Sequence, residues 1–244
     1  MSETVSVDEP RAAERAVEVL REGQLVVLPT DTTYGVAADA FQPAATQALF
    51  AVRNASRDTP LPVFIRSPRQ LIGLTEDAGE QAQRLVAAFW PGPLTMVFTA
   101  GEALTWDLGE TQGTVAIRLP AHDFVQELIA AVGPLAVTGA NTVATLPPST
   151  VAGARAVLGD RVALYVDGGR CDGGPSTIVD VSRGGAEVLR RGAVTADAVF
   201  EAASGATQWG APTPDPEPGP EEAPEEAPEE ASEESVEEAS GEAR

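Results

Sequence analysis

Arginine and hydroxyl side chains recur in this sequence where short apolar segments end. Residues 24–28 are followed by PTDTTYG, which contains Thr32 and Tyr34, and residues 115–117 are followed directly by Arg118. Guanidinium groups bind carboxylates and phosphates through paired donors, and hydroxyl groups add short-range donors. Proteins of the α/β class bind ligands at the ends of their strands. These residues therefore predict a pocket for a small anionic ligand.

Four later segments extend the same pattern. Each combines arginine, hydroxyl or amide groups with small residues that let a ligand approach the backbone closely. The candidates are Arg53 and Arg57 in RNASRDTPL, Thr138 and Asn141 in VTGAN, Ser176 in GGPST, and Arg190 in LRRG. On composition alone, each segment could instead be a solvated loop, a tight turn or a structural ion pair.

Missing residue types narrow the chemistry. All 16 basic residues are arginine, which excludes a Schiff-base lysine, a lysine general base and a phosphate-loop lysine. One cysteine, Cys171, excludes an internal disulfide and a multi-cysteine zinc site, and one histidine, His122, excludes a multi-histidine metal centre. We predict no metal site built from the chain's own residues. The remaining chemistry is positioning with electrostatic stabilisation, as in phosphoryl or nucleotidyl transfer.

Charge and composition divide the chain of 244 residues into a body and a tail. The formal charge is −21, and repeats such as APEEAPEEASEE concentrate acidic residues after residue 205. Such a segment buries too little apolar surface to offset the entropy of ordering, so we predict a disordered tail that either solvates the chain or docks a basic partner. No apolar run of about 18 residues occurs and the acidic start does not resemble a signal peptide, so we expect a cytoplasmic protein without a membrane partner.

The body alternates helical and strand patterns. The predicted helices are residues 13–20, 44–52, 80–89, 123–132 and 152–158. The predicted strands are residues 24–28, 62–65, 94–98, 115–119, 135–137, 163–166, 177–181 and 186–189. Helices that separate strands in this way predict one layered domain of the α/β class.

Five segments in this order resemble the YrdC-type threonylcarbamoyl-AMP synthases: PTDTTYGVAADA, FWPGPLT, VAIRLP, PSTIVDV and VLRRGAV. The resemblance covers residues 10–194. It implies a YrdC-like α/β domain over residues 1–205, with a twisted mixed sheet and flanking helices around a large cavity, followed by the tail at 206–244. It also implies an activity: L-threonine, bicarbonate and ATP, accompanied by Mg²⁺, would give threonylcarbamoyl-AMP and pyrophosphate. Downstream transfer enzymes would then use the product for t6A modification of tRNA.

The resemblance assigns the candidates to two ends of the implied cavity. Thr32 and Tyr34 would line the threonine pocket, and Arg118 and Ser176 would lie near the threonine carboxylate. A second group would serve the nucleotide and the chemistry: Thr138, Asn141 and Arg190 facing the adenylate, with Arg53 and Arg57 as catalytic residues.

Two motifs depart from the family pattern. In place of K-x-R the sequence has Arg53-Asn54-Ala55, and in place of Ser-Ala-Asn it has Gly139-Ala140-Asn141. Arginine keeps the charge of lysine but not its geometry, and Arg57 could compensate for the arginine lost at Ala55.

These departures leave two alternatives to the synthase open. One is a divergent paralogue that binds a nucleotide or a threonine-like ligand without this activity. The other is an RNA-binding module, which would need a basic rim around the cavity formed by Arg53, Arg57, Arg66 and Arg69. The acidic charge of the chain argues against the second alternative.

Overall fold

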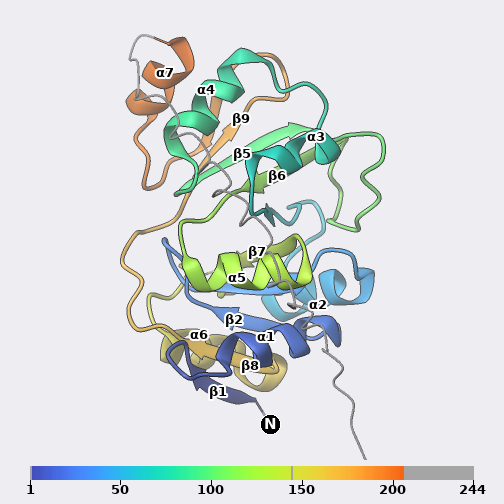
Figure 1. The fold of residues 1–244 in the computed structure, drawn as a ribbon, viewed down its shortest axis with the longest axis vertical. Coiled ribbons are helices and arrows are strands. Elements are labelled where there is room, and N and C mark those ends of the chain that lie inside the picture. Colours follow the sequence, from blue (N-terminus) through green and yellow to red (C-terminus); the bar gives the residue numbers. More distant parts are fainter. Residues whose placement is uncertain (1, 144, 206–244) are drawn as a thin grey trace, which may run out of the picture. The chain divides into compact units, whose positions relative to one another are not determined.

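A computed structural model describes residues 2–143 and 145–205 of the chain. The predicted tail at 206–244 lies outside the described residues. Ten strands of the described part form one mixed sheet, shown in Figure 1, in the order β1-β8-β2-β3-β7-β4-β6-β5-β9-β10. The strands are β1 Glu3–Ser6, β2 Val26–Leu28, β3 Gly35–Asp39, β4 Val63–Phe64, β5 Leu94–Thr99, β6 Thr114–Arg118, β7 Leu135–Gly139, β8 Leu164–Asp167, β9 Thr177–Asp180 and β10 Glu187–Arg190. The α/β class and the twisted mixed sheet are thereby confirmed.

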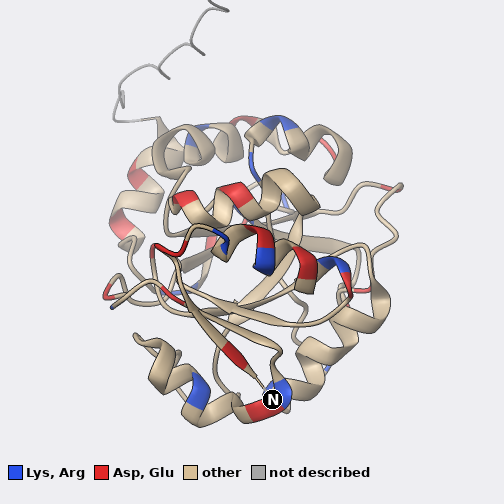
Figure 2. Ribbon diagram, turned by 60° about the horizontal axis from the view of Figure 1, so that its bottom comes forward, with Lys and Arg blue, Asp and Glu red and all other residues tan. Residues whose placement is uncertain are grey.

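Seven α-helices and two short 3₁₀ helices flank the sheet in the described part. They are α1 Ala12–Arg21, α2 Pro43–Arg53, α3 Leu71–Leu74, α4 Gly79–Phe89, α5 Asp123–Val132, α6 Val151–Leu158, α7 Ala196–Ser204, η1 Pro68–Gln70 and η2 Gly159–Arg161. Charged residues are seen mainly on these helices and on loops (Figure 2). None of the described helices is both long and apolar enough to cross a membrane.

The sequence patterns did not predict β1, β3, α3 or α7. Strand β3 consists of GVAAD, whose five residues are all buried. Small residues buried on both faces show neither the alternation of a half-exposed strand nor the spacing of a helix. Helix α7 begins after Thr195, whose Oγ1 accepts a hydrogen bond from the Ala198 N–H, and it ends at Gly205 in the left-handed conformation. These are the usual start and stop signals of a helix.

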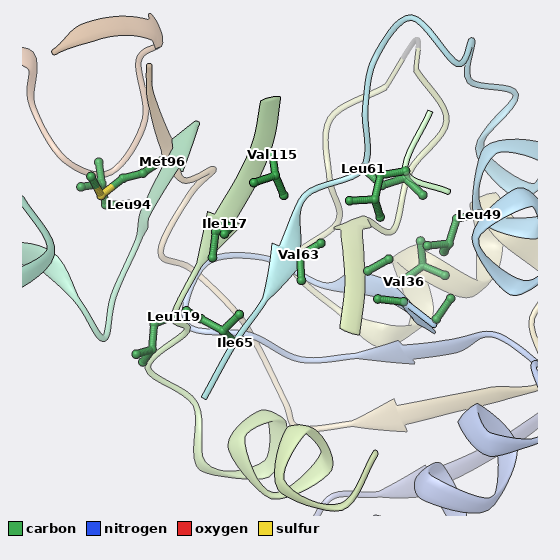
Figure 3. Packing of buried hydrophobic residues seen from close by; sticks show 14 of the residues in the cluster. Val36, Leu49, Leu61, Val63, Ile65, Leu94, Met96, Val115, Ile117 and Leu119 are labelled. Atoms are coloured by element: carbon green, nitrogen blue, oxygen red, sulfur yellow. The ribbon is translucent and has the colours of Figure 1, made fainter. Parts of the chain in front are cut away.

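Both faces of one half of the sheet are covered by helices. In β2, Val26 and Leu28 pack in a cluster with residues of α1 and α5, whereas Val27 points to the other face and packs in a larger cluster that includes residues of α2 and α6. The same alternation holds in β7 and β8. Figure 3 shows the larger cluster extending across neighbouring strands, with Val63 and Ile117 among its members.

The edge strand β10 is fixed closely to the start of β9. Val188 pairs with Val179 but Arg190 pairs with Ile178, so the register shifts and Leu189 forms a bulge. The chain then passes so near the preceding segment that a Cβ on Gly192 would lie 2.4 Å from the Pro175 carbonyl oxygen. Only glycine fits this contact without moving a backbone.

We therefore expect Gly192→Ala to destabilise the protein, because the added methyl group meets backbone rather than a flexible side chain. Overpacking of this kind costs about 1–3 kcal/mol. Gly185→Ala is the matched control, since a Cβ there has open space around it. Urea unfolding of both variants measures the difference, and equal unfolding free energies would contradict the close approach.

Candidate functional site

A cavity of about 600 Å³ opens on the second half of the sheet. In β5, Leu94, Met96 and Phe98 pack in the larger core cluster, whereas the alternating residues Thr95 and Val97 line the cavity. Strand β6 behaves in the same way, with Thr114, Ala116 and Arg118 facing the cavity. One face of this half of the sheet is therefore covered by protein, and the other face forms the cavity wall.

Loops that follow β2 and β7 supply further lining residues, together with residues that precede β4. They contribute hydroxyl and amide groups and a set of prolines. Eight of the nine predicted site residues line this cavity: Thr32, Tyr34, Arg53, Arg118, Thr138, Asn141, Ser176 and Arg190. The structure thus brings together residues spread over more than 150 positions of the sequence.

The ninth residue, Arg57, does not line the cavity. Its Nη2 donates to Asp107, its guanidinium lies 5.1 Å from the centre of the Phe50 ring, and its carbonyl oxygen accepts from the Glu110 N–H. Arg57 thus fastens the loop that joins β5 to β6. Arg57 is therefore not placed where it could replace the arginine lost at Ala55 inside the cavity, and with Arg53 inside the cavity the two do not form an external basic rim for RNA.

Arg118 is only 3% exposed and every nitrogen of its guanidinium has a partner. Nε donates to the Gly92 carbonyl oxygen at 2.9 Å, Nη1 to Thr32 Oγ1 at 3.0 Å and Nη2 to Asp31 Oδ1 at 2.6 Å. Burial lowers the pKa of the Arg118 guanidinium, and the Asp31 carboxylate opposes that shift. The charge of Arg118 is therefore neutralised by Asp31, and its hydrogen bonds connect β6 to two loops.

Arg190 and Ser176 form one unit. Arg190 Nη2 donates to the Ser176 carbonyl oxygen at 2.8 Å and to Ser176 Oγ at 3.0 Å, and Nε donates to the same carbonyl at 3.2 Å. The resemblance had placed Ser176 at the threonine end and Arg190 at the adenylate end. The structure instead joins them, because the bulge at Leu189 turns Arg190 toward the segment that precedes β9.

Arg53 lies at another part of the wall, where α2 ends. Its Nε donates to the Asn141 carbonyl oxygen at 2.9 Å and its Nη1 to Thr138 Oγ1 at 2.6 Å. Burial lowers the pKa of Arg53, and the charge of Arg190 lowers it further. Burial likewise lowers the pKa of Arg190, with a further contribution from the charge of Arg118. The cationic forms of these arginines would therefore be favoured by an anion in the cavity.

Tyr34 lines the cavity, and its hydroxyl group is occupied by contacts with the backbone. Its hydroxyl donates to the Gly169 carbonyl oxygen at 2.7 Å and accepts from the Gly168 N–H at 3.0 Å, which fixes the turn after β8. Burial raises the pKa of Tyr34 to about 12. The ring is fully buried, so its phenol serves the cavity wall by holding this turn.

Two buried threonines of the cavity were missed as site residues. Thr30 Oγ1 lies 2.9 Å from Thr32 Oγ1, and Thr95 Oγ1 lies 2.9 Å from Ser176 Oγ. Thr95 stands in FWPGPLT, one of the five segments that carry the family resemblance, and Trp90 of the same segment is buried in the core. The signal that could have revealed Thr95 is the alternation of LTMVF, in which a polar residue stands between large apolar ones.

The cavity does not fit a metal held by the protein. Mg²⁺ usually takes one or two carboxylates together with substrate phosphates. Neither aspartate nor glutamate is among the described residues that line the cavity, and the described part of the chain has no cluster of three metal-ligating side chains. Any Mg²⁺ would have to be held by the phosphates of a bound nucleotide.

Two buried polar atoms have no hydrogen-bond partner in the described structure: His122 Nδ1 and Asp31 Oδ2, the second oxygen of the carboxylate that pairs with Arg118. Burial lowers the pKa of His122, while the charges of Asp31 and Asp123 oppose this shift. His122 is therefore held in its neutral form near neutral pH.

Because His122 is the one histidine of the chain, its titration can be followed without assignment. We expect an NMR midpoint below the ordinary pKa of about 6.5 in the folded protein and near 6.5 in urea. Between these two values the unfolded state binds more protons, so the free energy of unfolding falls as the pH is lowered through this window. His122→Gln should flatten that slope, and a folded midpoint above 6.5 would contradict the burial argument.

Comparisons of sequence agree with this arrangement. The Sua5/YciO/YrdC family model, which carries the description "Telomere recombination", matches residues 18–192. A Mycobacterium tuberculosis protein provisionally named threonylcarbamoyl-AMP synthase is 41% identical over 206 residues, covering 82% of this chain and 95% of that protein. The threonylcarbamoyl-AMP synthase of Bacillus subtilis is 33% identical over 202 residues, covering 82% of this chain and 58% of that protein.

Solved structures show the same fold. Pyrococcus abyssi Sua5 complexed with L-threonine matches with a TM-score of 0.75 and 29% identity, covering 83% of this chain and 60% of that one. Escherichia coli YciO matches with a TM-score of 0.71 and 23% identity, covering 79% of this chain and 96% of that one, a likeness that concerns the fold alone. The family model and these relatives show that the chain belongs to the Sua5/YciO/YrdC family.

Proposed function

We propose that this protein is a threonylcarbamoyl-AMP synthase, which uses L-threonine, bicarbonate and ATP to supply t6A modification of tRNA. One observation carries the proposal. Three arginines line a cavity that has no acidic residue among its described lining, and only Arg118 has a carboxylate partner. Arg53 and Arg190 remain uncompensated in the described structure. Such an arrangement suits a reaction in which negative charge must be bound and stabilised.

The two uncompensated arginines suggest where each substrate lies. Arg190 and Ser176 would bind the carboxylate of L-threonine, beside the hydroxyl of Thr32. Arg53, supported by Thr138, would face the triphosphate of ATP. This assignment moves Arg190 from the adenylate to the amino acid, because its three hydrogen bonds tie it to Ser176.

The chemistry then requires mainly positioning. The amine of L-threonine and bicarbonate form a carbamate with loss of water. A carbamate oxygen attacks the α-phosphorus of ATP, the bond to the β-phosphate oxygen breaks, and pyrophosphate leaves. Arg53 would stabilise the charge on the phosphates as this bond breaks, and the apolar part of the cavity wall would limit access of water. Mg²⁺ would arrive bound to ATP and screen its phosphates.

The test is pyrophosphate release by the purified full-length protein with L-threonine, bicarbonate and ATP·Mg²⁺. We expect release that requires all three substrates. Arg53→Ala should lower kcat/KM by about 100-fold, the usual cost of removing one donor from a developing anion. Arg11→Ala is the control, because Arg11 forms only an exposed ion pair with Glu14 on α1. A folded wild-type protein that releases no pyrophosphate would refute the proposal.

A paralogue that binds ligand without turnover is the second candidate, and Gly139 favours it. A Cβ at this position would lie 2.4 Å from Asn141 Oδ1, so the Asn141 side chain occupies the space that a serine in the family pattern would need. Asn141 Nδ2 in turn donates to the Thr142 carbonyl oxygen at 2.8 Å. This part of the cavity therefore offers a ligand fewer hydrogen-bond donors than a cavity with serine at position 139 would. Calorimetry that detects ATP and L-threonine binding without pyrophosphate release would select this candidate.

A further inference from the structure

The hydroxyl groups of Thr95 and Ser176 contact each other beside Arg190. Thr95 lies on β5, Ser176 directly precedes the neighbouring parallel strand β9, and their hydroxyl oxygens are 2.9 Å apart. Both side chains line the cavity and both are more than nine-tenths buried, at 3% and 7% exposure. Apart from Ser176, Thr95 Oγ1 has no hydrogen-bond partner in the described structure.

The hydrogen-bonding capacity of Ser176 limits how this contact can be made. A serine hydroxyl has one proton and two lone pairs. One lone pair of Ser176 Oγ accepts from Arg190 Nη2, since a guanidinium can only donate. The Ser176 proton can then go either to Thr95 or into the cavity, and Thr95 can fill the second lone pair only in the second case.

The charge of the ligand decides whether the Ser176 proton points to Thr95 or into the cavity. A hydroxyl that accepts from a cation is a stronger donor, and hydrogen bonds in a chain polarise one another. The Ser176 proton will therefore prefer an anionic oxygen over the neutral oxygen of Thr95. With an anion in the cavity, both lone pairs of Ser176 are filled by Arg190 and Thr95, and its one proton points to the ligand.

Charge balance indicates a singly charged group at this position. Asp31 neutralises Arg118, so Arg190 supplies one net positive charge here. Its Nη1 has no partner among the described residues, while its Nε and Nη2 are held by Ser176. One free guanidinium nitrogen, Nη1, beside one hydroxyl donor suits a carboxylate, whose two oxygens can each accept one hydrogen bond.

We infer that Thr95 is a positioning residue, which donates its hydroxyl proton to Ser176 and so directs the Ser176 proton to the carboxylate of the amino-acid substrate. This inference rests on the proposed function, which supplies that substrate. Thr95 itself acts through Ser176.

The inference is tested with Thr95→Val, which removes the hydroxyl at nearly constant volume, and Thr95→Ser, which keeps it. Calorimetric titration with L-threonine should show Kd raised about tenfold in the valine variant, the effect of one lost hydrogen bond in a buried chain. The serine variant should bind L-threonine within about twofold of wild type, and the Kd for ATP should stay unchanged in both. In the pyrophosphate assay, KM for L-threonine should rise while KM for ATP does not.

Thr99→Val is the matched control. Thr99 lies on the same strand, its hydroxyl donates to the Ser182 carbonyl oxygen at 3.1 Å, and it does not line the cavity. Its variant should bind L-threonine as wild type does, and thermal unfolding of all variants checks that each is folded.

Four outcomes would overturn the inference. If Thr95→Val binds L-threonine as wild type does, or if Thr95→Ser is as weak as Thr95→Val, the hydroxyl does not position Ser176, and the proposed function stands. If affinity for ATP falls as much as affinity for L-threonine, the change is a general disturbance of the cavity. If the folded wild type binds no L-threonine, the proposed function fails and the inference falls with it.

Discussion

The burial of Arg118 is the constraint on which the cavity depends. A guanidinium that is 3% exposed is costly unless it is paired and hydrogen-bonded, and Asp31 with its 2.6 Å contact meets that requirement. The partners of Arg118 come from the loop before β5, from the loop after β2 and from the face of the Phe64 ring, whose centre lies 5.3 Å away. The contacts that neutralise and hydrogen-bond the Arg118 guanidinium thus hold together elements that are far apart in the sequence. It also leaves Arg53 and Arg190 as the charges available to a ligand.

The alternation of side chains along β5 and β6 forms the wall of the cavity around Arg118. In the half of the sheet where helices cover both faces, apolar residues alternate between two cores. In β5 and β6 the same alternation places large apolar residues in one core and small or polar residues in the cavity. The wall is therefore made of strands that are anchored on their other face, which limits how far its donors can move. Tyr34 adds rigidity by fixing the turn after β8.

Much of this architecture is readable from the sequence, because helices and strands with large apolar residues show their periodicity. Helix α5 has the predicted bounds, and its end at Gly133 follows from the positive φ of that glycine. Strand β3 was missed because its small residues carry no periodic signal. Eight of the nine candidate residues line one cavity, but the sequence did not indicate the partner of any arginine. The contacts of Arg57 with Asp107 and of Arg190 with Ser176 are set by loop packing and by a bulge, which depend on the folded chain.

The bulge at Leu189 has a consequence for how the chain tolerates changes in length. Side chains alternate along a strand, so one extra residue reverses which face every later side chain occupies. If Leu189 were deleted, Arg190 would directly follow Val188 and would still pair with Ile178. If all residues were kept but the strands paired without the bulge, Arg190 would pair with Thr177, which points away from the cavity. The bulged and the regular pairing therefore differ by one position, and only the bulged pairing directs the guanidinium of Arg190 into the cavity. An inserted residue in this short edge strand would turn Arg190 away from the cavity and remove anion binding from a domain that still folds, whereas deletion of Leu189 would leave Arg190 opposite Ile178.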